Sequence, residues 1–122
     1  MKLYTLEKDK TTYQVQLAVK TYCNNNLGIY MNLCKRGKAK MEEILTVNFP
    51  VTLPENCACI DINNNSRDIL AWIVRNGLAK PTGRTIESGF CTYPEYRFRA
   101  SALKEADPEG YEKYLQCQKK IS

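Results

Sequence analysis

The sequence contains no histidine among its 122 residues. Histidine is the side chain that titrates closest to neutral pH, and it is the commonest metal ligand in proteins. Its absence excludes Ser-His-Asp and Cys-His nucleophilic mechanisms within one chain. We therefore expect a protein that works by binding and is not an enzyme.

Long apolar runs are also missing. None approaches the roughly 20 residues that a membrane-spanning helix requires. The N-terminus becomes charged at residues 7–10, before the apolar region of a secretory signal peptide has room to form. We expect a cytoplasmic protein whose cysteines are reduced.

The bulk composition is that of a globular protein. The hydrophobic share of 43% and the charged share of 25% are ordinary values for such proteins, and the length suits one domain spanning 1–122. The formal net charge of +5 permits an acidic partner but is moderate for this size.

Alternating apolar residues predict strands over 13–19, 27–33 and 43–49, and a fourth over 57–62. The first two connections, 24–26 and 35–38, have the composition of turns, which favours an antiparallel meander. A helix is predicted over 66–76, with Ser66 as its N-cap, and another over 108–119, beginning at Pro108. The expected fold class is α+β: an antiparallel sheet of four to five strands with two main helices packed on one face.

The segment 80–96 is rich in Pro, Gly, Ser and Thr, and it is also aromatic. This composition predicts an ordered loop on a scaffold, where binding residues tend to lie. Arg and aromatic side chains dominate the energetics of protein interfaces. The expected partner-binding residues are Lys80, Arg84, Phe90, Tyr93 and Tyr96.

The six cysteines allow two interpretations. Cys57 and Cys59 would lie on one face of a strand, and Cys23 and Cys91 would complete a zinc site if the fold brings them close, although zinc ligands usually have two-residue spacers. Alternatively, most of these thiols are small buried apolar residues, and the protein has no cofactor.

A basic cluster predicts nucleic-acid binding as the alternative function. It comprises Lys35, Arg36, Lys38 and Lys40. Tyrosines such as Tyr30 would offer stacking faces. Acidic residues interrupt the basic ones, however, and charged hairpins often only solvate a sheet edge.

A small-molecule site is a third possibility, with polar groups from Asp61, Asn63, Asn64 and Ser88. Asp61 has a simpler role open to it, since Asp often accepts hydrogen bonds from turn amides that follow a strand.

Several short motifs occur in a fixed order along the chain. They are Tyr22-Cys23-Asn24-Asn25-Asn26-Leu27, Leu53-Pro54-Glu55-Asn56, Pro81-Thr82-Gly83-Arg84 and Ser88-Gly89-Phe90-Cys91-Thr92-Tyr93-Pro94. In these motifs the chain resembles a small domain family of Firmicutes prophages and integrative conjugative elements. The resemblance carries no catalytic residue with it.

The resemblance implies a counter-defence role in the host bacterial cell. The function expected from it is that of an anti-CRISPR inhibitor, which binds a type II effector nuclease stoichiometrically through protein–protein contacts. Because the chain is basic, it would block a protein surface and would not imitate the phosphates of DNA.

Overall fold

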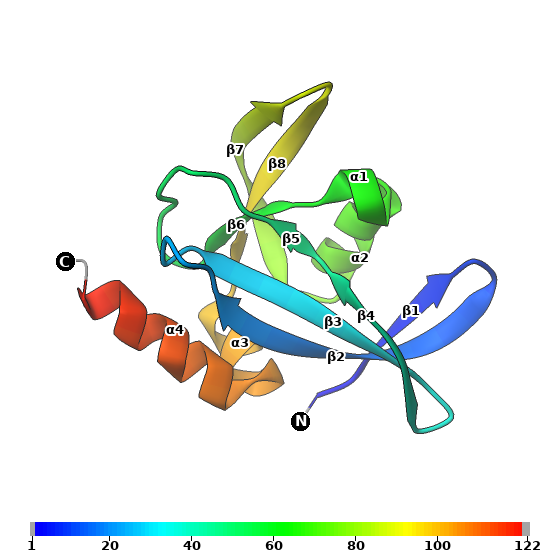
Figure 1. Cartoon of the computed structure of the whole chain (residues 1–122). Helices are drawn as coiled ribbons and strands as arrows, with labels where there is room; N and C mark the ends of the chain where they lie inside the picture. The colour runs from blue at the N-terminus through cyan, green and yellow to red at the C-terminus, as the bar shows by residue number, and fades with distance from the viewer. Residues whose placement is uncertain (1, 121–122) are drawn as a thin grey trace.

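The computed structural model describes residues 2–120, apart from the side chains of residues 40 and 120. These residues form two four-stranded antiparallel sheets and four helices (Figure 1), which confirms the α+β class. None of the described helices has the length and apolar character needed to span a membrane.

The first sheet has the strand order β1-β2-β3-β4. Its strands are β1 (Tyr4–Lys8), β2 (Thr11–Thr21), β3 (Leu27–Lys35) and β4 (Lys38–Ile44). The apolar alternation in β2 is confirmed, because Val15, Leu17 and Val19 are all buried. Each strand is joined to the next by a short turn, so the predicted antiparallel meander is confirmed for this sheet.

The second sheet has the strand order β5-β6-β8-β7. Its strands are β5 (Thr46–Val47), β6 (Cys57–Ile60), β7 (Ala79–Ser88) and β8 (Cys91–Phe98). The strand predicted over 43–49 is therefore divided at Leu45. The Leu45 amide donates to Ile29 O, and Leu45 O accepts from the Asp61 amide, both at 2.9 Å, so this residue joins the two sheets.

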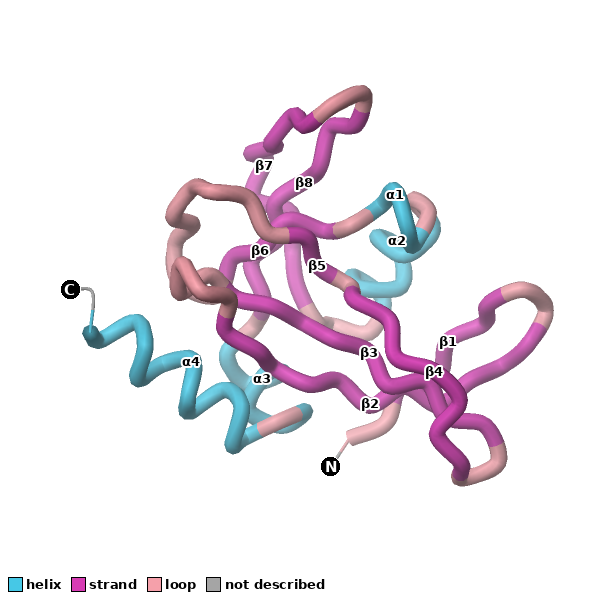
Figure 2. Tube along the Cα trace, in the orientation of Figure 1, coloured by secondary structure: helices cyan, strands magenta, loops and turns pink. Residues whose placement is uncertain are grey.

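The helices are α1 (Ile62–Asn65), α2 (Asp68–Arg75), α3 (Ala100–Ala106) and α4 (Pro108–Lys120). The helices α3 and α4 lie along β2, whereas α1 and α2 lie beside the second sheet and β1 (Figure 2). The prediction that α4 begins at Pro108 is confirmed.

The start of α2 was predicted wrongly. Ser66 has φ +64° and ends α1, and α2 begins at Asp68. Residues 62–65 are helical because Asp61 caps them. The Asp61 carboxylate accepts from the Asn64 amide at 3.2 Å, so its predicted bond to a local amide is confirmed.

The buried apolar side chains of both sheets and of α2, α3 and α4 form one cluster. Its largest fully buried members include Leu17, Ile29, Leu33, Ile60, Phe98 and Tyr114. The Tyr114 hydroxyl also accepts a hydrogen bond from the Asn56 amide at 2.8 Å, which ties α4 to the start of β6.

The prediction of a loop over 80–96 is wrong, because β7 and β8 pair there as a hairpin. Pro and Gly are tolerated since β7 is an edge strand and the pairing register shifts between Pro81 and Thr85. Proline and glycine in sheets are found at such edges and bulges. The composition that favoured a loop instead marks an irregular edge strand.

Candidate functional site

The tip of the β7–β8 hairpin presents Phe90 entirely to solvent, with a relative exposure of 109%. Ser88 and Cys91 form the last pair of the hairpin, so Gly89 and Phe90 are its two turn residues. Gly89 has φ +62°, and glycine is favoured at the first position of a type II′ turn. The hairpin projects away from the rest of the molecule (Figure 1), so the ring at its tip is accessible.

A buried carboxylate braces the hairpin below its tip. Glu95 on β8 is 2% exposed. It accepts a hydrogen bond of 2.6 Å from the Thr82 hydroxyl and forms an ion pair of 2.6 Å with Arg84 Nη2. Both partners lie in the irregular part of β7. The bulge therefore positions two donors over one carboxylate, and the Arg84 guanidinium is engaged within the chain.

Two of the residues expected to contact a partner are buried instead. Tyr96 is 6% exposed and belongs to the core, where burial raises the pKa of its hydroxyl. Tyr93 is 9% exposed, and its ring packs against Phe49 with a centroid separation of 5.3 Å. The structure thus does not present these two side chains to a partner: they lie on opposite faces of β8, and Tyr96 packs in the core whereas Tyr93 packs against Phe49. Lys80 is exposed on β7, opposite Arg97.

Cys57 and Cys59 are fully buried on β6, in pairs with Arg97 and Glu95 of β8. They lie on the face of β6 opposite to the core residues Ala58 and Ile60. Burial raises the pKa of the Cys59 thiol to about 11, and the nearby Glu95 carboxylate adds to this effect. The thiol is thus protonated at neutral pH and is a poor nucleophile.

The four thiols considered for zinc do not form one group. Cys23 is exposed in the β2–β3 turn, and the Cys91 thiol lies 3.7 Å from Asn63 Oδ1. Within residues 2–120, apart from the two undescribed side chains, no three Cys, Asp or Glu side chains are arranged to hold a metal ion. The structure therefore places Cys57 and Cys59 apart from Cys23 and Cys91.

The basic cluster occupies the tip of the β3–β4 hairpin. Arg36 and Gly37 both have positive φ, which is the pattern of a type I′ turn, and the side chains of Lys35, Arg36 and Lys38 are exposed. The side chain of Lys40 lies outside the described part of the structure.

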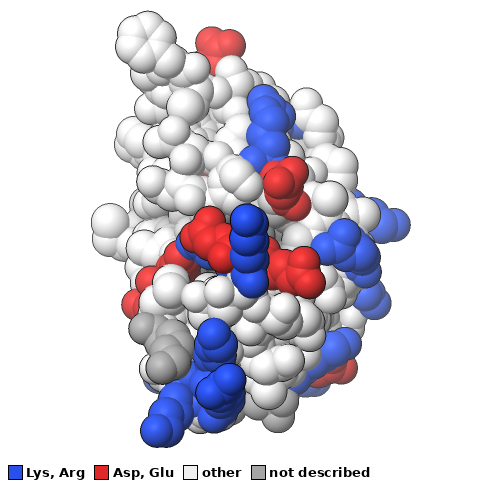
Figure 3. Space-filling model, turned by 90° about the vertical axis from the view of Figure 1, so that its right-hand side faces the viewer, with Lys and Arg blue, Asp and Glu red and all other residues white. Residues whose placement is uncertain are grey.

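Tyr30 is not placed to assist the basic cluster. It pairs with Ile44, at the other end of the hairpin from the turn. Figure 3 shows a group of basic side chains at the bottom of this side of the molecule and a largely acidic band above it, which separates it from the other basic side chains. On this face, the described residues thus do not form a continuous basic groove with stacking faces of the kind that single-stranded nucleic acids require.

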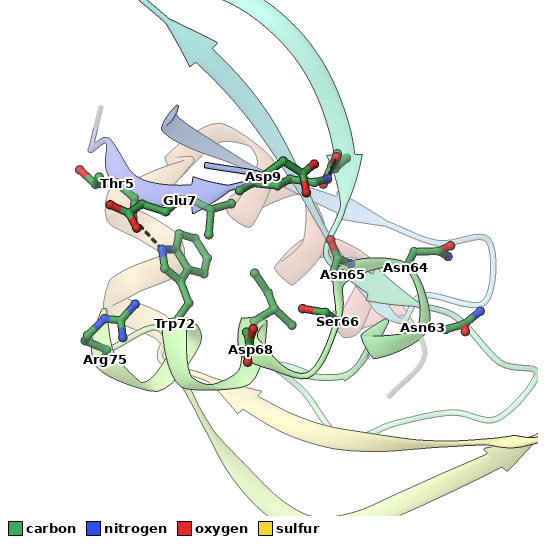
Figure 4. Close-up of a pocket in the computed structure, with 14 residues that line it drawn as sticks. Thr5, Glu7, Asp9, Asn63, Asn64, Asn65, Ser66, Asp68, Trp72 and Arg75 are labelled. Carbon is green, nitrogen blue, oxygen red and sulfur yellow. Dashed lines mark hydrogen bonds and ion pairs between the residues drawn. The ribbon is translucent and has the colours of Figure 1, made fainter. Parts of the chain in front are cut away.

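A cleft of about 690 Å³ lies between β1 and the α1–α2 segment (Figure 4). The Trp72 indole forms part of its wall and donates to Thr5 O at 2.7 Å. Lys8 and Glu43 form an ion pair at its edge. Its remaining charged lining residues are Glu7, Asp9, Asp68 and Arg75, so the cleft is acidic in a chain that is basic overall.

The structure divides the residues proposed for a small-molecule site. Asn63 and Asn64 line the acidic cleft, and Asn64 also lines, together with Asp61, a neighbouring cleft of about 480 Å³. Ser88 lies in the β7–β8 hairpin. The side-chain Nδ2 of Asn64 already donates a hydrogen bond to Asp61 Oδ2 at 2.7 Å.

The acidic cleft was not predicted, because residues 7–10 were interpreted only as a charged terminus. The signal was present: Tyr4 and Leu6 alternate with Thr5 and Glu7, which is the period of a strand. The distant residues that complete the cleft, on α1 and α2, have no sequence pattern that connects them to β1.

Comparison with known proteins places the chain in a sequence family. Residues 16–118 match the family described as "Domain of unknown function (DUF4313)". This match extends from β2 through most of α4, so it includes both sheets apart from β1 and the start of β2. The comparisons with curated proteins and with solved structures gave no match. Because the family match covers most of its length, the chain belongs to the DUF4313 family.

Proposed function

We propose that this protein binds another protein stoichiometrically and that the β7–β8 hairpin inserts Phe90 into an apolar pocket of the partner. The observation that carries the proposal is the complete exposure of Phe90 at the hairpin tip. An aromatic ring in water is unfavourable, and burial of a Phe side chain stabilises by about 1.5–3 kcal/mol. Large aromatic side chains that enter partner pockets are typical interface hot spots.

The base of the hairpin supports this role. Glu95 holds Thr82 and Arg84, and Tyr93 packs against Phe49, so both strands are braced below the tip. A braced hairpin loses little conformational entropy on binding, and this preorganisation raises affinity. In this proposal Phe90 is the anchor and Arg84 is a positioning residue, because its guanidinium already pairs with Glu95.

The target class comes from the resemblance to domains of prophages and integrative conjugative elements. Small proteins of such elements act on host defence machinery, so a type II CRISPR effector nuclease in the bacterial cytoplasm is the first target to test. The protein would then be an anti-CRISPR inhibitor without enzymatic activity. With a formal charge of +5, it would contact a protein surface and would not replace DNA.

Nucleic-acid binding is the second candidate, and the exposed tip of the β3–β4 hairpin favours it. Lys35, Arg36 and Lys38 are exposed there. Phosphate contacts make affinity fall steeply with salt, whereas an apolar contact through Phe90 depends weakly on salt. Salt dependence therefore separates the two functions.

The test compares the parent protein with Phe90→Ala in titrations against a purified type II effector nuclease. We expect an affinity loss of about 30-fold or more, since hot-spot truncation costs about 2 kcal/mol or more. Val74→Ala is the matched control, because Val74 is another exposed apolar residue, at 50%, and lies on α2. Thermal unfolding should be the same for all three proteins.

Three results would oppose the proposal. If Phe90→Ala binds as tightly as the parent, the hairpin tip is not the contact. The second result comes from matched affinity captures from host lysate, together with the nuclease titration. If no protein in either assay binds the parent more tightly than it binds Phe90→Ala, protein binding through Phe90 is refuted. If the parent instead binds duplex DNA with a steep salt dependence that Arg36→Ala reduces, the second candidate replaces the first.

A further inference from the structure

The base of the β7–β8 hairpin carries two cations that face each other. Lys80 on β7 is the register partner of Arg97 on β8, so both side chains project from the same face of the second sheet. Both residues are exposed. Like charges directly opposite each other on neighbouring strands destabilise a sheet. This pair therefore does not stabilise the free protein.

The nearby carboxylate of Glu95 does not balance these two cations. Glu95 lies two positions before Arg97 on β8, on the same face of the sheet, and its charge acts on Arg97. Its Oε1 atom already forms the ion pair of 2.6 Å with Arg84 Nη2. The ion pairs found between described residues include neither Lys80 nor Arg97. Three cations thus share one carboxylate, and this surface keeps a net positive charge.

The two cations and Phe90 lie on one hairpin and fit within one interface. At about 3.3 Å per residue, the strand from Lys80 to Ser88 is roughly 25 Å long. A standard interface covers about 800 Å² on each partner, which is roughly 30 Å across. Interfaces commonly surround an apolar contact with a polar rim. A partner that receives Phe90 can therefore also cover the base of the hairpin.

We propose that the partner protein presents a cluster of Asp and Glu side chains to Lys80 and Arg97, beside the apolar pocket that receives Phe90. This inference rests on the proposed function, because it names the chemistry of the partner surface around the same hairpin. Carboxylates of the partner replace repulsion between the two cations with attraction, so the pair is favourable in the complex only. Complementary charge of this kind speeds association and selects the partner.

Nucleic-acid phosphates fit this surface less well than carboxylates of a protein. Proteins that follow a phosphate backbone line a groove with cations over several nucleotides. Here the two cations lie side by side across one strand pair, and the exposed Glu87 lies on β7 between them and the tip. A carboxylate at that position repels a nucleic acid that would run from the base of the hairpin to Phe90.

The first part of the test measures the thermal unfolding of the free protein. Lys80→Glu sets opposite charges across the strand pair, so it should raise Tm by about 1–4 °C. Arg97→Gln removes one of the two like charges, and its Tm should be no lower than that of the parent. Lys38→Glu is the matched control, because Lys38 faces Lys35 across the β3–β4 hairpin on the other sheet. It makes the same charge change and relieves the same kind of repulsion.

The second part titrates these variants and Phe90→Ala against the purified type II effector nuclease. At about 0.1 M salt, Lys80→Glu should weaken binding by about tenfold or more, Arg97→Gln should weaken it in the same direction, and Lys38→Glu should bind like the parent. Between about 0.1 M and 1 M salt the screening length falls from about 10 Å to about 3 Å, so at 1 M salt Lys80→Glu should bind within about twofold of the parent. The loss caused by Phe90→Ala should be the same at both salt concentrations.

The outcomes separate this inference from the proposed function. If Lys80→Glu and Arg97→Gln bind like the parent whereas Phe90→Ala binds weakly, this inference is overturned and the hairpin proposal stands. A loss with Lys38→Glu equal to that with Lys80→Glu, or a lower Tm for Lys80→Glu than for the parent, overturns it as well. If the nuclease does not bind, the titration uses the host protein that the parent captures from lysate and Phe90→Ala does not. If there is no such protein, the proposed function and this inference both fail.

Discussion

Replacement of Gly110 by alanine should destabilise this protein, although the same change in a helix interior normally stabilises by about 1 kcal/mol. Gly110 is the third residue of α4, and the first turn of this helix lies against β2. A Cβ atom at this position would lie 2.5 Å from the backbone oxygen of Val19 and closer still to the Asp107 carboxylate. Real Cβ atoms do not approach other atoms so closely, so the helix or the carboxylate has to move.

The displaced carboxylate holds two backbone amides. Asp107 accepts from the Gly110 amide at 3.0 Å, which caps α4, and from the Val19 amide at 2.8 Å, which attaches the helix to β2. Loss of an N-cap costs about 1 kcal/mol. An unpaired buried amide at Val19, which is 3% exposed, costs about 1–3 kcal/mol. After subtraction of the gain of about 1 kcal/mol in helix propensity, Gly110→Ala should lower the free energy of unfolding by about 1–3 kcal/mol.

Urea denaturation followed by circular dichroism measures this difference directly. In an Asp107→Ala background the second substitution should cost less, because the carboxylate that it displaces is absent, and the double-mutant cycle isolates that coupling. If Gly110→Ala is as stable as the parent or more stable, the close packing of α4 on β2 and the role assigned to Asp107 are both wrong.

Two further predictions concern the Arg84–Glu95 ion pair in the β7–β8 hairpin and the reactivity of the thiols. Arg84→Ala should lower the free energy of unfolding by about 3 kcal/mol, because it leaves the buried Glu95 carboxylate without its cation. Glu95→Gln should lower it by only about 1 kcal/mol, because Arg84 can then turn to solvent. Equal losses for the two variants in urea denaturation would contradict this asymmetry. In alkylation at pH 8 followed by mass spectrometry, the exposed Cys23 should react before the buried Cys59, whose pKa is raised to about 11. Because the unfolded thiol ionises at lower pH than the folded one, this group should also reduce stability progressively as the pH rises toward 11. Fastest reaction at Cys91 would instead indicate an activated nucleophile and reopen the question of catalysis.

The period-two alternation was sufficient to predict β2 and β3, because one face of each strand is fully buried and the other is mostly half-buried or exposed. It failed at 43–49, where the alternation continues although the chain passes from one sheet to the other at Leu45. Nothing local marks that transition, since the bonds that define it connect Leu45 to Ile29 and Asp61, far away in sequence. Ser66 was misassigned for a related reason: its residue type suits an N-cap, but the preceding α1 holds it at φ +64°.

By itself, the sequence determined the class of the fold, the positions of β2, β3, β6 and α4, and the lack of imidazole chemistry, because these depend on local periodicity, local caps and composition. Only the tertiary structure decided which residues of the segment 80–96 face solvent. The core covers Tyr96 on one face of β8, Phe49 covers Tyr93 on the other, Glu95 engages Arg84, and Phe90 remains exposed at the hairpin tip. The physical reason is that the direction of a strand side chain depends on register and on the partner strand, which are properties of the folded sheet and not of the segment alone.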